Sequence, residues 1–302
     1  MGRTPFAVAV EGGQLVGWVE GSGPELLLLH GGPGLSADYL DGLVAELVPG
    51  YRVAVYQQRG LAPSTEQGPL DVDGHVADVA AVIRGLGWKR ALVAGHSWGG
   101  YLATHVAARL PGLVHGVLAI DPIGGVGDGG VEAFEAAMNA RTPDVNRQRA
   151  RELDERAMRG EGDEQTALEG LALVWPAYFA HPDDAPPMLP VRMSVEGYAA
   201  GYESMVKELP ALESLLPTVR VPVGFVLGAE SPIPPDQAGG ATADRIPDAW
   251  VEIIPDAGHF IWLEKPGAVR AAVDRLARSV EPIGGRVATP RPLPRARRRR
   301  NP

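Results

Sequence analysis

The stretch Gly95-His96-Ser97-Trp98-Gly99 decides the fold, because it sets a G-x-S-x-G pattern between two clearly patterned segments. Residues 91–94 before it form a short apolar run, which predicts a buried strand. Residues 99–110 after it are alanine-rich with apolar positions at helical spacing, which predicts a helix that ends at Pro111. Ser97 then lies where a strand turns sharply into a helix, beside a helix N-terminus whose partial positive charge favours an oxyanion. We therefore expect Ser97 to be a nucleophile.

Strand patterns and helix patterns alternate along most of the chain, which predicts an α/β fold with a mostly parallel sheet and helices on both faces. Other expected strands cover 6–10, 14–20, 26–30, 52–56, 114–120, 221–227 and 251–254, and other expected helices cover 39–48, 71–86, 237–246 and 264–280. Between these groups the chain shows only helical patterns, at 132–140, 146–158 and 165–173. The predicted division is a core of 1–123 and 218–283, a helical insertion of 124–217 and a disordered Pro/Arg-rich tail of 284–302.

Two more motifs support this interpretation: HGGPG at 30–34 and GHF at 258–260, each after an apolar strand pattern. Together with GHSWGG at 95–100, they resemble the α/β-hydrolase fold, and within it the proline iminopeptidase branch. The resemblance covers most of 6–120 and 220–280. It implies a helical cap inserted after the sixth strand, and a serine hydrolase that cleaves an ester or amide bond, with the bond after an N-terminal proline among the candidates.

The chemistry of a serine nucleophile requires a base and an oxyanion site. His259 is the candidate base, since it follows a strand and comes last in the chain, as the fold requires. The backbone N–H groups of Trp98 and Gly32 are the candidate oxyanion donors. Pro33 has no N–H and is excluded from that role. This set predicts acyl-enzyme chemistry on Ser97.

The triad acid departs from the family pattern, because Ser231 stands where the family has an aspartate after the seventh strand. Asp121, at the end of the strand 114–120, is our first choice, since haloalkane dehalogenase-like members of the fold take their acid from that strand end. Glu230 and Asp236 stay open as alternatives, as does a site without an acid. Ser231 also leaves open a non-hydrolytic member of the fold, either a small-molecule binding protein or an isomerase or cyclase.

The loop after the fourth strand and the cap add two expectations. Family members often have Asp-Gln-Arg-Gly where this chain has Gln57-Gln58-Arg59-Gly60. The resemblance implies that Arg59 braces the Gly-rich loop 31–34, called the oxyanion loop below because it carries the Gly32 N–H. Aromatic residues of the insertion look exposed in the sequence, and they either line the pocket or pack between cap helices: Trp175, Tyr178, Phe179, Tyr198 and Tyr202. In aminopeptidase relatives, cap carboxylates bind the free amine, and the candidates here are Asp183, Asp184, Glu196, Glu203, Glu208 and Glu213.

Composition limits the remaining function classes. The 302 residues have a net charge of −9, but the last twelve contain six arginines, so the rest of the chain has 22 basic and 37 acidic residues. An acidic body argues against nucleic acid binding by the folded domain. The sequence lacks cysteine, an apolar stretch of membrane-spanning length and a signal-peptide pattern, so we expect a cytoplasmic protein without a membrane contact. It shows no metal-ligand or dinucleotide motif, so no cofactor is expected, and the expected partner is a small-molecule or short-peptide substrate.

Overall fold

The computed structural model of the protein describes residues 2–280 and contains one sheet of eight strands in that range. The strand order is β1-β2-β4-β3-β5-β6-β7-β8, with antiparallel pairing of β1 to β2 and of β2 to β4 and parallel pairing elsewhere. The strands are β1 Thr4–Val10, β2 Gly13–Gly21, β3 Glu25–Leu29, β4 Arg52–Tyr56, β5 Ala91–His96, β6 Val114–Ile120, β7 Val223–Gly228 and β8 Ala249–Ile254. The predicted mostly parallel sheet is confirmed, and β1 and β2 pair as a hairpin.

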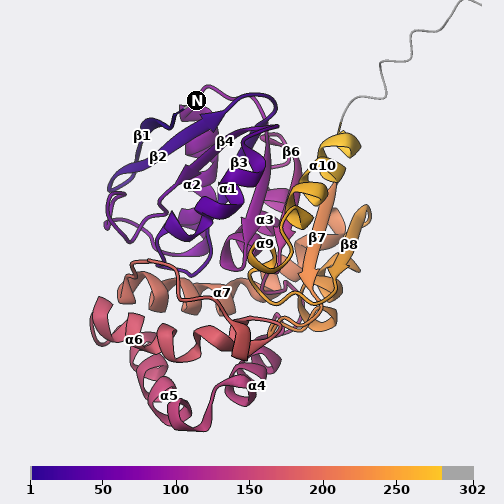
Figure 1. The fold of residues 1–302 in the computed structure, drawn as a ribbon. Helices are drawn as coiled ribbons and strands as arrows, with labels where there is room; N and C mark the ends of the chain where they lie inside the picture. Colours follow the sequence, from indigo (N-terminus) through magenta and orange to yellow (C-terminus); the bar gives the residue numbers. More distant parts are fainter. Residues whose placement is uncertain (1, 281–302) are drawn as a thin grey trace, which may run out of the picture.

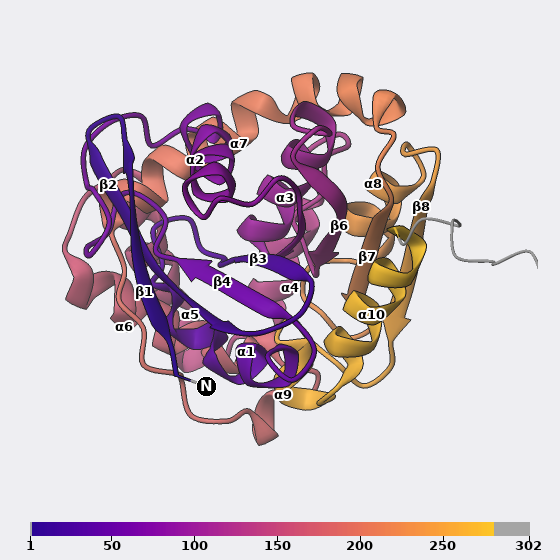
Figure 2. The same ribbon diagram turned by 90° about the horizontal axis from the view of Figure 1, so that it is seen from above.

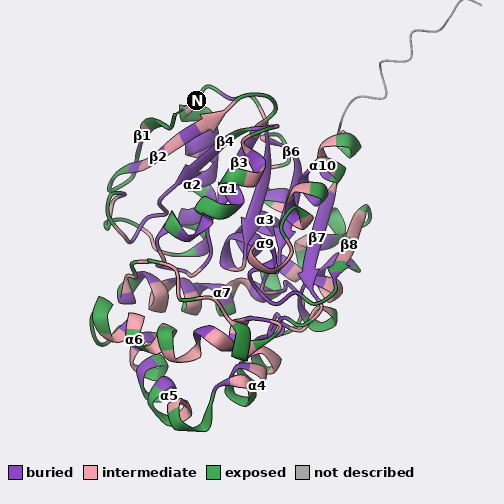
Figure 3. Ribbon diagram, in the orientation of Figure 1, coloured by how far each residue is buried: buried purple, intermediate pink, exposed green. Residues whose placement is uncertain are grey.

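Helices cover both faces of this sheet (Figure 2). One face packs against α2 (Val72–Gly85) and α3 (Trp98–Arg109), and the other against α1 (Asp41–Leu47) and α10 (Ala268–Val280). Every residue of β5 is buried because helices lie above and below it and strands on both sides. Burial is equally complete in β7, which is purple in Figure 3. The apolar side chains form one core cluster on each face, which fixes the strand ends rigidly in space.

Between β6 and β7 the chain forms four helices, which lie together in the lower half of Figure 1. They are α4 Val131–Arg141, α5 Asp144–Met158, α6 Glu164–Val174 and α7 Val195–Leu215. Helix α7 contacts α2 and α3 on one side and α5 on the other, so it separates the sheet layer from α5 and α6. A side chain at Gly201 would strike Pro33, so this glycine lets α7 approach the loop after β3 closely. The domain boundaries predicted from the sequence stay a prediction.

Several predicted elements differ in detail. The helix expected at 39–48 is a 3₁₀ turn, Ala37–Leu40, followed by α1, and the last helix is divided into α9 (Ile261–Glu264) and α10. Helix α7 was not predicted, because two glycines and Pro210 interrupt its pattern; Ser194 nonetheless caps its first turn.

The expectation of exposed cap aromatics is wrong for Trp175 and Phe179, which are buried against Phe260. The predicted tail, 284–302, lies outside the described residues.

A search of the helices within 2–280 finds none with both the length and the apolar character needed to cross a bilayer.

Candidate active site

Ser97 sits on a tight turn between β5 and α3 with φ 56° and ψ −123°, a backbone conformation that costs free energy in a non-glycine residue. Its N–H donates to the carbonyl of Ile120 at 2.9 Å, which ties the turn to β6. A side chain at Gly95 would strike the backbone of Gly99, so the G-x-S-x-G glycines are needed for the turn itself. The Ser97 side chain does not cap α3, which leaves its hydroxyl available for chemistry.

His259 follows β8 and Asp121 follows β6, and the two side chains meet at the carboxyl edge of the sheet. His259 Nδ1 lies 2.6 Å from Asp121 Oδ2, and both side chains are almost completely buried. Asp121 accepts two further hydrogen bonds, one from the Ser231 hydroxyl at 2.5 Å and one from the Gly228 N–H at 2.9 Å. The residue in the usual acid position thus donates to the carboxylate that contacts His259.

Burial sets the charge state of this pair. It lowers the pKa of His259 from 6.5 to about 3, so the imidazole is neutral near pH 7. Burial also raises the pKa of the Asp121 carboxyl, and the hydrogen bonds from Ser231 and Gly228 lower it. With Nδ1–H donated to Asp121, Nε2 of the neutral ring carries a lone pair and can accept a proton.

The alternative acids lie elsewhere. Glu230 and Asp236 are both exposed, and neither carboxylate contacts His259. The backbone carbonyl of Glu230 instead accepts a hydrogen bond from Arg141 at 2.6 Å. Of the three candidate acids left open by the sequence, the structure brings only Asp121 to the imidazole.

The two predicted oxyanion donors flank the turn that carries Ser97. Trp98 is the first residue of α3, and Gly32 has φ +103° in the loop after β3. Neither N–H is paired with an acceptor from the described part of the chain. The preceding N–H, of Gly31, donates to the Tyr39 hydroxyl at 2.5 Å and is therefore occupied. The Gly31 position is so close to the nucleophile that a side chain there would meet the Cβ of Ser97 at 3.0 Å.

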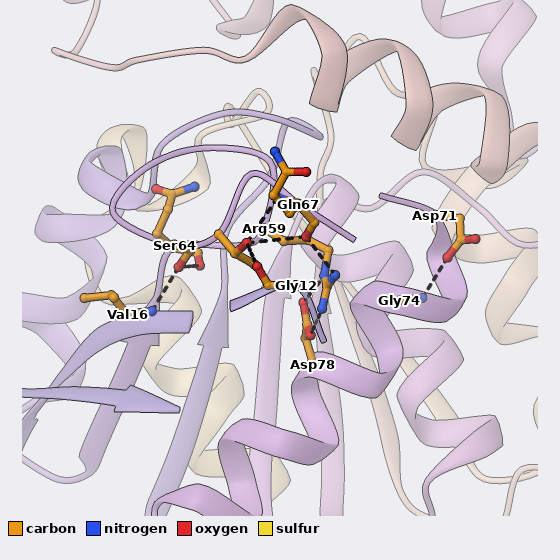
Figure 4. Close-up of polar contacts among 10 residues, drawn as sticks. Gly12, Val16, Arg59, Ser64, Gln67, Asp71, Gly74 and Asp78 are labelled. Atoms are coloured by element: carbon orange, nitrogen blue, oxygen red, sulfur yellow. Dashed lines mark hydrogen bonds and ion pairs between the residues drawn. The ribbon is translucent and has the colours of Figure 1, made fainter. Parts of the chain in front are cut away.

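Arg59 does not brace the oxyanion loop, contrary to the expectation from the sequence. Its Nε and Nη2 each lie 2.6 Å from Asp78 of α2, in a buried two-point ion pair (Figure 4). Gln57 instead contacts the residues that directly follow the oxyanion loop. It accepts a hydrogen bond from the Ala37 N–H and donates one to the Leu35 carbonyl, both at 3.1 Å. A neutral amide fits this place because it both donates and accepts, which a carboxylate cannot do.

Two side chains of the site, Tyr39 and His96, were not predicted. A third, Tyr178, is one of the aromatic residues of the insertion that the sequence suggested for the pocket. The Tyr178 carbonyl accepts the His259 N–H at 2.7 Å, and its ring stacks on the imidazole with 5.2 Å between centroids. Tyr178 belongs to the segment between β6 and β7, so this segment contacts the candidate base directly. A glycine at 258 allows the approach, because a side chain there would strike the Tyr178 carbonyl.

The model of the Alpha/beta hydrolase family matches residues 26–272. The chain belongs to this family. It is 29% identical over 241 residues, 78% of this chain and 87% of the relative, to the Mycobacterium tuberculosis protein named "Putative non-heme bromoperoxidase BpoC". It is 33% identical over 123 residues to the 2-(acetamidomethylene)succinate hydrolase of Mesorhizobium japonicum, covering 40% of this chain and 44% of that enzyme.

The fold also matches solved structures. The enol-lactonase of Burkholderia xenovorans superposes with a TM-score of 0.64 at 22% identity, covering 90% of this chain and 100% of the lactonase. At that identity the match shows a shared fold. The family match supports hydrolase activity for this protein.

Proposed function

We propose that the protein is a serine hydrolase that cleaves an ester or amide bond through an acyl-enzyme on Ser97. The observation that carries this proposal is the buried 2.6 Å hydrogen bond between His259 and Asp121. Ser97, Asp121 and His259 follow β5, β6 and β8, so they gather at one edge of the parallel sheet. A nucleophile, a base and an acid at one edge are what acyl transfer needs.

The proposed reaction has two half-reactions, formation and hydrolysis of the acyl-enzyme, and the triad residues act in both. The Ser97 hydroxyl attacks the acyl carbon while His259 Nε2 takes its proton, and Asp121 stabilises the imidazolium that forms. The N–H groups of Trp98 and Gly32 hold the negative charge on the carbonyl oxygen. The imidazolium then protonates the leaving group, and the same base activates water to hydrolyse the acyl-enzyme.

Ser231 has a supporting role in this scheme. Its hydroxyl donates to Asp121 and accepts from the Ile233 N–H at 3.1 Å, so its position is fixed by the loop after β7. With Gly228 it holds both carboxylate oxygens, so Asp121 keeps the orientation that faces His259. A serine here is therefore compatible with a complete triad.

The proposed substrate class rests on the names of two similar hydrolases. The enol-lactonase and the 2-(acetamidomethylene)succinate hydrolase are hydrolases by name, which favours a small ester, lactone or amide. Two cap carboxylates, Asp154 and Glu135, accept hydrogen bonds from Tyr198 and Tyr202 at 3.1 and 3.2 Å. They are different residues from the cap acids expected from the sequence, whose role in binding a substrate amine stays a prediction.

Turnover of p-nitrophenyl acetate and prolyl-p-nitroanilide by wild type and Ser97→Ala tests the proposal. Ser214→Ala is the matched control, because Ser214 is an exposed serine on α7 that bonds only its own helix. We expect ester cleavage that Ser97→Ala abolishes and Ser214→Ala preserves, with one fluorophosphonate bound per wild-type chain. Cleavage of the anilide would extend the activity to peptides. Failure of the probe to label Ser97 would contradict the proposal and favour a binding protein or an isomerase.

A further inference from the structure

A buried row of hydrogen bonds lies behind the triad and takes no part in the chemistry proposed above. The Gly31 N–H contacts the Tyr39 hydroxyl at 2.5 Å, and that hydroxyl lies 2.9 Å from His96 Nδ1. His96 Nε2 lies 3.0 Å from the backbone carbonyl of His259. Tyr39 and His96 are both almost fully buried. The row therefore joins the loop that carries one oxyanion donor to the residue that carries the base.

The hydrogen atoms of this row can have only one arrangement. The His259 carbonyl can only accept, so His96 carries its proton on Nε2 and donates it there. Nδ1 of the neutral ring is then an acceptor, so the Tyr39 hydroxyl donates to it while accepting from the Gly31 N–H. Burial and the nearby His259 both lower the pKa of His96 well below its usual value, which keeps the ring neutral as this arrangement requires.

Packing holds the two side chains in this arrangement. Trp262 packs edge-on against the His96 ring with 4.8 Å between centroids, and it also contacts Tyr39 at 6.1 Å. Phe260 contacts both rings, at 5.3 Å from His96 and 6.0 Å from Tyr39. A shift of either ring would break hydrogen bonds and contacts together, so the row transmits position between its ends.

The base itself is held at both ends of its peptide unit. The His259 N–H donates to the Tyr178 carbonyl at 2.7 Å, and its carbonyl accepts from His96. The side-chain bond to Asp121 restrains the imidazole through a third contact. Removing His96 would leave only two of these three restraints on the candidate base.

We propose that Tyr39 and His96 are positioning residues that fix the oxyanion loop and His259 relative to Ser97. This inference rests on the serine hydrolase function proposed above. Displacing a reacting group by about 1 Å costs on the order of 100-fold in rate. Changing either residue is therefore expected to lower the rate of acyl transfer, and not only the folding stability.

The two ring nitrogens of His96 can be tested separately. His96→Gln places an amide nitrogen near the Nε2 position, where it can still donate to the His259 carbonyl. His96→Leu removes both contacts, and Tyr39→Phe removes the link to Gly31 and to His96. Tyr51→Phe is the matched control, since Tyr51 is a buried tyrosine whose hydroxyl bonds Asp274 through a 2.6 Å contact outside the site.

The readout is kcat and KM for p-nitrophenyl acetate, per site titrated with a fluorophosphonate, beside the melting temperature. We expect kcat to fall about 100-fold in His96→Leu and about 10-fold in Tyr39→Phe, with KM nearly unchanged. His96→Gln should recover at least about 10-fold of the loss in His96→Leu. Tyr39→Phe/His96→Leu should be no slower than His96→Leu, because both changes interrupt the same row.

The outcomes separate this inference from the proposed function. If Ser97→Ala abolishes turnover but the Tyr39 and His96 variants keep kcat per titrated site within about threefold of wild type, the positioning role is overturned and the hydrolase proposal stands. If Ser97→Ala keeps wild-type turnover, the hydrolase proposal itself fails. Should His96→Leu not fold, Tyr39→Phe decides beside its control: a loss in kcat of about 10-fold relative to Tyr51→Phe supports the role, and kcat equal to that of Tyr51→Phe refutes it.

Discussion

Replacing Asp121 with asparagine exchanges one carboxylate oxygen for an NH₂ group and so disturbs the acceptor that orients the base. In the protein, Asp121 accepts three hydrogen bonds: from His259 and Ser231 on Oδ2 and from Gly228 on Oδ1. Asparagine has one oxygen and one NH₂ group. If its oxygen stays on the Gly228 N–H, the NH₂ faces Nδ1 of His259, which must then act as the acceptor. The proton moves to Nε2, where the ring no longer accepts from Ser97.

The opposite orientation of the amide keeps an oxygen facing His259 Nδ1, but it sets the NH₂ group against the Gly228 N–H, donor to donor, and is therefore disfavoured. The favoured orientation is the one that loses base function. The known cost of holding a catalytic histidine in the wrong tautomer is about 10⁴ in kcat, or about 5 kcal/mol of activation free energy. Asparagine tolerates the positive φ of residue 121, which is 44°, so the fold should survive.

The assay is kcat for p-nitrophenyl acetate at pH 7 and 25 °C for wild type, Asp121→Asn and Glu230→Gln, with unfolding midpoints measured alongside. We expect Asp121→Asn to lose at least about 100-fold, approaching 10⁴, and the exposed Glu230→Gln to stay within about twofold of wild type. A folded Asp121→Asn protein within tenfold of wild type would refute the assignment. A large loss in Glu230→Gln alone would move the acid to that residue.

Three further predictions concern the surroundings of the triad. Ser231→Ala should lower kcat by about tenfold, less than Asp121→Asn, since one of three donors to the carboxylate is lost; kcat equal to either wild type or Asp121→Asn would contradict this. Because burial lowers the pKa of His259 and raises that of Asp121, the active pair of neutral His259 and ionised Asp121 takes up one proton on acidification, and kcat/KM should fall toward low pH in a pH–rate profile; a kcat/KM unchanged from about pH 8 to about pH 4 would disagree. Asp78→Asn should cost about 3–5 kcal/mol in urea unfolding, because it leaves the buried Arg59 without its charge partner, and a loss under 1 kcal/mol would count against that ion pair.

The parts of the site that the sequence predicts are those encoded by short segments. Ser97 follows from a strand pattern, two glycines and a helix pattern within about twenty residues, and the turn is found where expected. His259 follows in the same way from a strand and a Gly-His pair. Local signals of this kind work because backbone geometry at a turn depends on few neighbours. Their catalytic roles remain proposals.

What the sequence does not predict depends on contacts between distant segments. Tyr39 and His96 are 57 positions apart, and their hydrogen bond exists only because β3 and β5 are neighbours in the sheet. The partner of Arg59 is likewise set by where α2 packs, and no local pattern identifies Asp78. Helix α7 was missed for a different reason, since packing stabilises a helix whose own propensity is weakened by Pro210.

Sheet topology explains why the triad acid can come from either of two neighbouring strand ends. Strands β6 and β7 are parallel neighbours, so the residues that follow them reach the same point beside the imidazole. Ser231 Oγ lies 2.5 Å from Asp121 Oδ2, which itself lies 2.6 Å from His259 Nδ1. Two carboxylates at such separation would repel each other and raise one pKa strongly. A carboxylate at 121 therefore favours a neutral donor at 231, and the serine that looks like a lost acid in the sequence is the complement of the acid at the neighbouring strand end.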